Sequence, residues 1–136
     1  ILKYYPNIKV VLSSTWRVQK NFRQQILSTF QEYNNNNNGS SILPTKEFYD
    51  VTDIKNHTER QWEIYDWLNT ITDQNIHAWI ALDDEELIDG DKNKNYRAIF
   101  ENHVVKTDSS IGLTKNDAET AIHLLKSQII ANNNDA

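Results

Sequence analysis

Short apolar runs alternate along this chain with longer stretches in which apolar residues recur at helical spacing, and no other feature constrains the fold as much. The runs have the length and the β-branched or aromatic content of strands. The longer stretches carry one apolar stripe on a polar helix, as Phe22, Ile26 and Phe30 do at spacings of four. Strands alternating with helices indicate βαβ units, and therefore an α/β, Rossmann-like fold of three layers with a mainly parallel sheet.

The pattern also predicts where each element lies. The predicted strands are 9–12, 48–52, 78–82 and 103–107. The first helix spans 18–33; the second starts in the capping box Thr58-Glu59-Arg60-Gln61 and ends before Asp73; the third starts at Thr114 and frays into Asn132-Asn133-Asn134.

Length and composition predict one domain over residues 1–136 with a real core. An apolar fraction of 38% and a charged fraction of 24% are values of a globular protein. Asn34 to Asn38 are followed by Gly39-Ser40-Ser41, and this segment has no apolar side chains whose burial could offset the entropy of ordering. We therefore expect an Asn-rich, flexible surface loop at 34–41.

Charge and residue usage exclude several classes of protein. A net charge of −5 makes a sequence-independent grip on nucleic acid an unfavourable hypothesis. The lack of Cys excludes disulfides, a thiolate nucleophile and a Cys-based zinc site, and it suits a reducing, intracellular compartment. No apolar run approaches the ~20 residues that span a bilayer, so a soluble protein is expected. Because the chain contains no Met, we expect it to begin inside a longer polypeptide.

Two pairs of polar residues follow predicted strands, at the ends where parallel sheets bind ligands. Asp83 and Asp84 close an apolar strand, and their mutual repulsion would be relieved by a hard cation such as Mg²⁺. Ser13 and Ser14 offer hydroxyls and amides that suit a phosphate or a carboxylate. The alternatives are a solvated loop with a capping Asp in the first case and ordinary turn or cap residues in the second.

Other side chains that could do chemistry are more weakly indicated. Arg17 and Arg60 could each place a guanidinium fork on an anion, although an isolated Arg is more often a surface cation. The chain contains no visible Ser/His/Asp nucleophilic arrangement. Its histidines lack metal-ligand spacing, and its tryptophans sit at positions expected of core and rim, so both sets are interpreted as structural. These residues are His57, His77, His103 and His123, and Trp16, Trp62, Trp67 and Trp79.

Taken in order, these pieces resemble the haloacid-dehalogenase (HAD) superfamily, and more narrowly the small HAD domains associated with RNA-repair proteins. The resemblance covers nearly the whole chain. It implies that Ser13, or failing it Ser14, supplies the phosphate-binding hydroxyl, that Arg60 is the basic residue of the third motif, and that Asp83 and Asp84 help to hold Mg²⁺. The blocks that carry it are Val10-Val11-Leu12-Ser13-Ser14-Thr15-Trp16-Arg17, the segment from Arg60 to Leu68, Ala81-Leu82-Asp83-Asp84, and His103 to Asp108 with Gly112-Leu113-Thr114.

The first motif of the superfamily, an Asp-x-Asp whose first Asp attacks phosphorus, has no counterpart, because no Asp precedes Ser13. We expect an upstream strand that this chain does not include; alternatively, the strand has been lost. Enzymatic activity therefore stays open. One hypothesis is Mg²⁺-dependent hydrolysis of a phosphomonoester by the parent protein, and the other is a catalytically inactive module that serves as a structural or interaction subunit with partner chains. The substrate is not predicted, since the insert-like segments 34–41 and 88–96 show no recognisable pocket.

Overall fold

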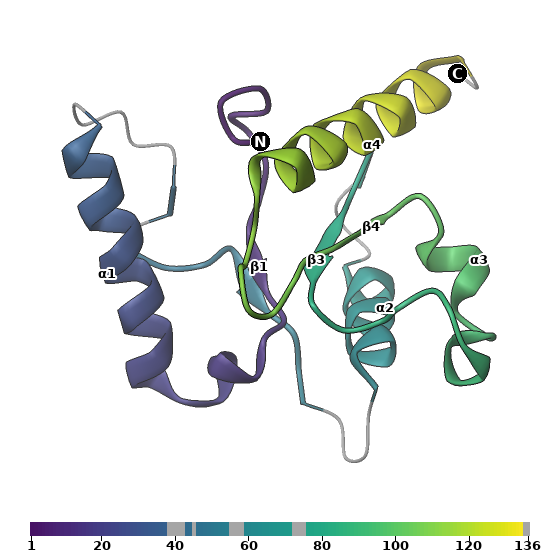
Figure 1. The fold of residues 1–136 in the computed structure, drawn as a ribbon, viewed down its shortest axis with the longest axis horizontal. Coiled ribbons are helices and arrows are strands. Elements are labelled where there is room, and N and C mark those ends of the chain that lie inside the picture. Colours follow the sequence, from purple (N-terminus) through teal and green to yellow (C-terminus); the bar gives the residue numbers. More distant parts are fainter. Residues whose placement is uncertain (38–42, 45, 55–58, 72–75, 135–136) are drawn as a thin grey trace. The chain divides into compact units, whose positions relative to one another are not determined.

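The computed structural model describes residues 1–37, 43–44, 46–54, 59–71 and 76–134, without the side chains of Trp16 and Arg17. The chain divides into two compact units, residues 2–68 and residues 69–136 together with Ile1. Each unit pairs two parallel strands and carries its own helices (Figure 1). The strand and helix order agrees with the predicted one, with short helices added.

In the unit 2–68, a minimal parallel pair forms the sheet. β1 (Val11–Leu12) pairs with β2 (Asp50–Val51). The pairing extends beyond the strands, because the N–H of Tyr49 donates to the Val10 carbonyl at 2.9 Å and the N–H of Thr52 donates to the Leu12 carbonyl at 3.1 Å. Both strands are shorter than predicted, and the residues of β1 are only half-buried.

α1 (Lys20–Asn36) follows a single 3-10 turn, η1 (Thr15–Val18). The helix extends three residues further than its apolar stripe predicts, so the start of the expected Asn-rich loop is wrong: 34–36 are helical. The cause is Asn34, which is buried and bonds in both directions to the backbone of Leu43, as donor at 3.1 Å and as acceptor at 3.4 Å. Residues 38–41 of the expected loop lie outside the described residues.

α2 (Arg60–Thr70) is the second predicted helix. Of its predicted capping box, Thr58 lies outside the described residues. Glu59 accepts the first helical hydrogen bond through its carbonyl, from the N–H of Trp62 at 3.0 Å. Trp67 on the same helix donates its indole N–H to the Asp50 carboxylate at 2.8 Å, which ties α2 to β2 inside this unit.

In the unit 69–136, β3 (Ala81–Asp83) pairs with β4 (Val104–Lys106) in parallel, with Asp83 opposite Lys106. The strand predicted at 78–82 is therefore shifted toward the acidic cluster. Its expected burial holds for Ala81, which is 8% exposed, but not for Leu82, which is 43% exposed. The correction follows from the period-2 alternation of side chains, which sends neighbours to opposite faces.

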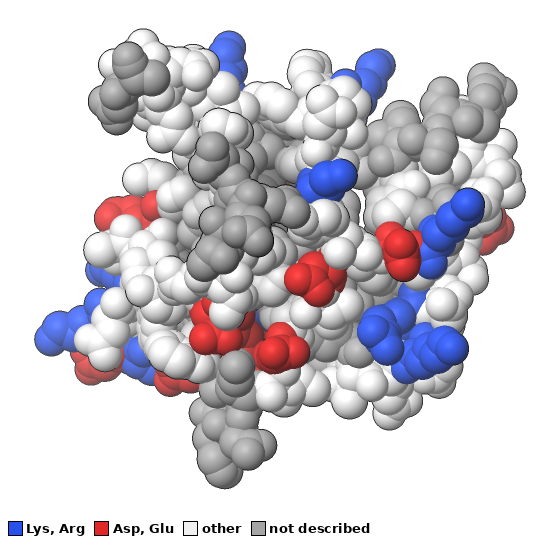
Figure 2. All heavy atoms as spheres, turned by 180° about the vertical axis from the view of Figure 1, so that it is seen from behind, with Lys and Arg blue, Asp and Glu red and all other residues white. Residues whose placement is uncertain are grey.

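The segment 88–96, expected to be a polar loop, contains structure that its charged composition conceals. η2 (Asp91–Asn93) forms inside it, α3 (Arg97–Phe100) follows directly after it, and Arg97 pairs with Asp89 at 3.3 Å. Figure 2 shows acidic and basic side chains intermixed around these two helices. The apolar anchor of the segment is Phe100, which is fully buried.

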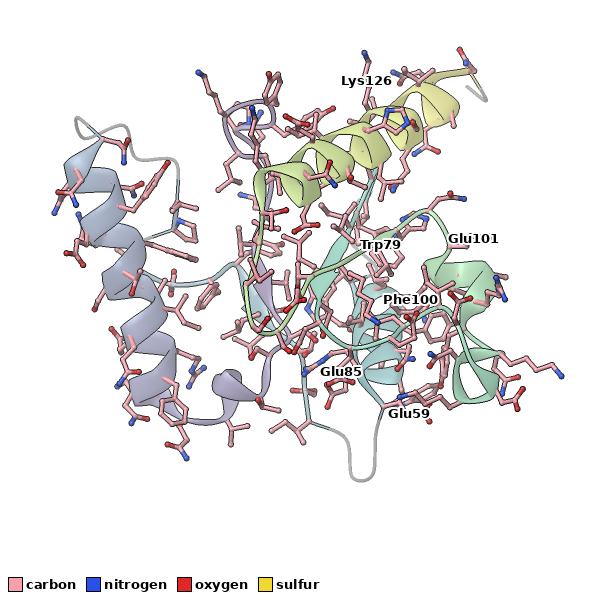
Figure 3. All side chains as sticks on the ribbon, in the orientation of Figure 1. Glu59, Trp79, Glu85, Phe100, Glu101 and Lys126 are labelled. Atoms are coloured by element: carbon pink, nitrogen blue, oxygen red, sulfur yellow. The ribbon has the colours of Figure 1, made fainter. Side chains whose placement is uncertain are left out.

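Trp79 organises the interior of this unit (Figure 3). Its ring meets Phe100 edge-on at 5.4 Å and stacks on His103 at 4.2 Å. The Trp79 backbone is held by Gln128 of α4 (Lys115–Asn134), which accepts from the Trp79 N–H at 3.0 Å and donates to the Trp79 carbonyl at 3.1 Å. His103 is thus a packing residue, as predicted.

α4 also continues further than expected, since 132–134 are helical and the Asn132 side chain donates to the His77 carbonyl. The helices and parallel strand pairs together make an α/β protein. A single, mainly parallel sheet within a three-layer fold stays a prediction.

We expect Phe100→Ala to destabilise the fold by about 3–5 kcal/mol, because it leaves a cavity beneath Trp79. Chemical denaturation of the two proteins measures the difference in the free energy of unfolding. The control is Ile111→Ala, at a side chain that is 71% exposed, for which a change within about 0.5 kcal/mol is expected. Equal effects of the two substitutions would contradict the assigned core.

Asn34→Ala should cost about 1–3 kcal/mol, because the half-buried backbone groups of Leu43 lose their partner. Asn36→Ala makes the same change at an exposed position of α1 and should be neutral or slightly stabilising, because Ala favours helix. Thermal or denaturant unfolding compares the two. A destabilisation shared by both variants would show that the effect is one of helix propensity.

Candidate functional site

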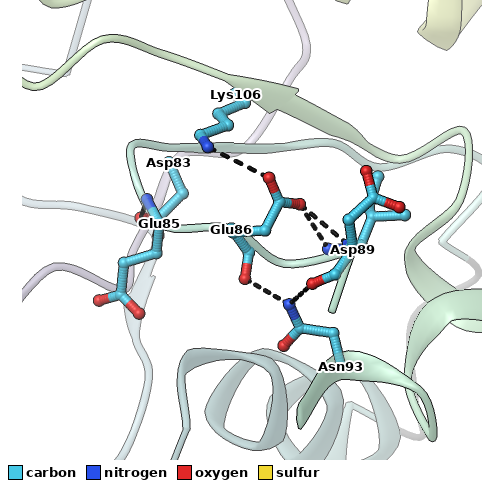
Figure 4. Close-up of polar contacts among 7 residues, drawn as sticks. Asp83, Glu85, Glu86, Asp89, Asn93 and Lys106 are labelled. Atoms are coloured by element: carbon cyan, nitrogen blue, oxygen red, sulfur yellow. Dashed lines mark hydrogen bonds and ion pairs between the residues drawn. The ribbon is translucent and has the colours of Figure 1, made fainter. Parts of the chain in front are cut away.

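The polar turn after β3 is held by hydrogen bonds and an ion pair among its charged groups (Figure 4). The Asp83 carboxylate accepts the N–H of Glu85 at 3.0 Å and so turns the chain at the strand end. One oxygen of Glu86 then accepts two amides, from Ile88 at 3.1 Å and from Asp89 at 3.0 Å. The acidic residues thus bind the backbone of their own turn.

Lys106 joins this turn to β4. Its ammonium lies 3.1 Å from the second carboxylate oxygen of Glu86. Hydrogen bonds from the backbone N–H groups of Asp89 and Ile88, followed by that from Lys106, lower the pKa of Glu86 to about 2. Glu86 is therefore an anion at any physiological pH, and it serves to hold the turn.

The side chain of Asn93 holds the acidic turn in place. Its side chain is fully buried and donates to the carbonyls of Glu86 at 2.7 Å and Asp89 at 2.6 Å. A buried amide that satisfies two backbone carbonyls costs several kcal/mol to misplace, so the turn has a defined shape.

Asp83 and Asp84 present carboxylates at the carboxyl end of β3, as predicted. Asp83 is half-buried and Asp84 is exposed. A carboxylate has about four lone-pair sites, so the amide bound to Asp83 is compatible with a metal at the same group. Within the described ranges, no group of three or more His, Asp or Glu side chains could hold a metal ion. The metal-binding role of Asp83 and Asp84 stays a prediction.

Ser13 and Ser14 lie directly after β1, in the unit 2–68, and both are half-buried. The hydroxyl of Thr52, directly after β2, donates to the hydroxyl of Ser13 at 3.3 Å. Parallel pairing thus brings two hydroxyls together at one strand edge.

The two predicted arginines have different outcomes. Arg60 is 9% exposed, and its guanidinium lies 3.4 Å from the Glu63 carboxylate one helical turn away, so it is a buried, paired cation and not the surface cation considered as its alternative. Arg17 belongs to η1, but its side chain lies outside the described part of the chain. The phosphate-binding role of both stays a prediction.

The closing block after β4 is a capped loop. The N–H of Thr107 donates to the Asp83 carbonyl at 2.8 Å. The Asp108 carboxylate accepts the hydroxyl and the amide of Ser110, which lower its pKa. The amide and hydroxyl of Thr114 likewise lower the pKa of Asp117. The Thr114 hydroxyl in turn accepts the N–H of Asp117 at 3.2 Å, which confirms Thr114 as the cap of α4.

Sequence reasoning missed four residues of these edges: Thr52, Glu86, Asn93 and Lys106. Two of them could have been found, because residues at the carboxyl ends of parallel strands meet at one edge, and Thr52 and Lys106 lie at or next to the ends of the strands predicted at 48–52 and 103–107. Glu86 and Asn93 act through side-chain bonds to backbone groups several residues away, and no sequence motif marks them.

In the part of the chain that the structure describes, no helix is long and apolar enough to cross a bilayer. The chain matches the family model described as "HAD domain in Swiss Army Knife RNA repair proteins" over residues 1–118. The predicted resemblance is thereby confirmed. No curated protein and no solved structure matches the chain.

The lowered pKa of Glu86 predicts a pH dependence of stability. The unfolded chain binds a proton at Glu86 near pH 4.5 and the folded chain only near pH 2, so the contribution of Glu86 is complete above 4.5 and is lost as the pH falls toward 2. Carbon-13 NMR titration of the Glu86 carboxyl should give a midpoint of about 2.

Two variants test the contribution of Glu86 to stability and the causes of its lowered pKa. Glu86→Gln should be less stable than the unchanged protein above pH 4.5, and the difference should shrink as the pH falls toward 2. Lys106→Met should keep most of the shift, because the amides of Asp89 and Ile88 are its larger causes. A normal Glu86 midpoint in Lys106→Met would contradict this assignment.

Proposed function

The chain belongs to the family of HAD domains found in Swiss Army Knife RNA repair proteins, and on this premise we propose that it forms the phosphate- and metal-binding part of a Mg²⁺-dependent phosphohydrolase. One observation carries the proposal: in each unit, the residues that the resemblance assigns to ligand binding directly follow or end a parallel strand. Ser13 follows β1, and Asp83 ends β3. Parallel α/β sheets bind their ligands at these ends.

Each residue has a distinct task in this proposal. The Ser13 hydroxyl, with Ser14 beside it, donates hydrogen bonds to the oxygens of a phosphate. Asp83 and Asp84 supply carboxylate oxygens to Mg²⁺, which offsets the repulsion between an anionic nucleophile and an anionic phosphate. The turn held by Glu86 and Asn93 keeps the two aspartates at the strand end.

The attacking carboxylate that the superfamily uses has no counterpart before Ser13. In this proposal, residues 1–136 bind and orient the phosphate, and none of them is assigned the role of attacking carboxylate. The contacts within each unit support the arrangement of polar side chains at the carboxyl ends of its strands. A phosphate-release assay tests whether catalysis takes place.

The alternative function is a catalytically inactive module that binds partner chains. The same missing Asp-x-Asp favours it. The two functions make opposite predictions for the polypeptide that contains this chain, since only the first releases phosphate from a phosphomonoester in the presence of Mg²⁺.

The substrate class is a phosphomonoester. The family description concerns RNA repair proteins, so an RNA oligonucleotide with a terminal phosphate is the second substrate to assay beside a small phosphomonoester. The net charge of −5 and the intermixed charges around η2 and α3 favour the small substrate, because binding to a polynucleotide normally uses a basic face.

In the polypeptide that contains this chain, Asp83→Asn and Asp84→Asn should each lower kcat/KM by about 10²-fold or more, because several kcal/mol of charge stabilisation are lost with the metal. Phosphate release at varied Mg²⁺ concentration measures the effect, and added Mg²⁺ should partly restore the activity of the variants.

Asp91→Asn is the matched control, since Asp91 is an exposed acid of the same unit that lies in η2. It should keep the activity of the unchanged protein. If the unchanged polypeptide releases no phosphate from either substrate, the phosphohydrolase proposal fails and the binding module remains.

A further inference from the structure

The carboxyl edge of the β1–β2 pair contains a residue that belongs to none of the motifs of the resemblance. Thr52 follows β2 directly, and its N–H donates to the Leu12 carbonyl at 3.1 Å. This bond continues the ladder past the strands, and it fixes the backbone of Thr52 beside that of Ser13. The two side chains meet as a consequence, with 3.3 Å between their hydroxyl oxygens.

The direction of this contact matters for chemistry. A hydroxyl has one proton to donate and two sites at which it accepts. The Thr52 hydroxyl donates to the Ser13 oxygen, which occupies one acceptor site of Ser13. The proton of Ser13 must then point away from Thr52, so the contact restricts the directions in which Ser13 can donate.

The burial of Thr52 suits it to orient the hydroxyl of Ser13. Thr52 is 4% exposed, whereas Ser13 is half-buried at the strand end. Two heavy atoms on Cβ restrict the χ1 rotamers of a threonine. Because the side chain of Thr52 is buried and stiff, its hydroxyl keeps one position. It can therefore orient the hydroxyl of Ser13 before a phosphate binds.

Packing alone does not require a hydroxyl at this position. Val has nearly the shape of Thr but places a methyl group where the hydroxyl donor now lies. The choice of Thr over Val therefore bears on the polar contact with Ser13.

We propose that Thr52 is a positioning residue, which holds the hydroxyl of Ser13 in the orientation that donates to a phosphate oxygen. The inference rests on the proposed phosphate-binding role of Ser13 and adds to it a residue that acts through Ser13 without touching the phosphate.

The experiment is a double-mutant cycle with inorganic phosphate as the probe. The dissociation constant is measured by NMR titration for the unchanged chain, Thr52→Val, Ser13→Ala and the double variant. Thr52→Val should weaken phosphate binding about 3- to 10-fold, the loss of one oriented hydrogen bond. In the Ser13→Ala background the same substitution should have no further effect.

Thr52→Ser keeps the hydroxyl with a smaller side chain and should bind phosphate within about 2-fold of the unchanged chain. It also serves if Thr52→Val does not fold. The matched control is Thr29→Val in the same unit, which removes a hydroxyl that donates to the Gln25 carbonyl at 3.0 Å and should leave phosphate binding unchanged.

The outcomes separate a failure of the proposed phosphate site from a failure of the positioning role of Thr52. Binding that Ser13→Ala does not weaken, or no binding by the unchanged chain, overturns the phosphate site and the inference with it. Binding that Ser13→Ala weakens but Thr52→Val does not, or equal effects of Thr52→Val with and without Ser13, overturns the positioning role alone. Loss of binding in Thr52→Ser equal to that in Thr52→Val also overturns it.

Discussion

Parallel pairing of very short strands is the constraint on which the rest of this structure depends. Two or three residues per strand supply few ladder hydrogen bonds, yet parallel pairing already decides which residues meet at a strand end. Ser13 meets Thr52 in one unit for this reason, and Asp83 lies opposite Lys106 in the other. Parallel pairing thus brings polar side chains together at both of these edges.

Strands this short need other anchors, and side-chain amides provide them. Gln128 binds the backbone of Trp79 ahead of β3, Asn93 binds the carbonyls of the acidic turn, and Asn34 binds Leu43. Each amide satisfies backbone groups that a longer ladder would have paired. The many Asn residues of this sequence are thus partly structural, which average polarity does not reveal.

The acidic turn divides its carboxylates between two environments. Glu86 is committed to the amides of Ile88 and Asp89 and to Lys106, so it shapes the turn. Asp83 and Asp84 stand before it at the end of β3. Consequently the repulsion expected among four adjacent acids is relieved in part by backbone N–H groups and one lysine.

The sequence by itself determined the α/β order of elements, the family, and the positions of Ser13, Asp83 and Asp84 at strand ends, because hydrophobic periodicity and local motifs are properties of neighbouring residues. Only the tertiary structure decided that Asn34 extends a helix, that α3 forms within a charged segment, that Arg60 is buried against Glu63, and that Thr52 reaches Ser13. The last depends on a contact 39 residues apart in the chain, and burial and register across such distances leave no periodic trace in the sequence.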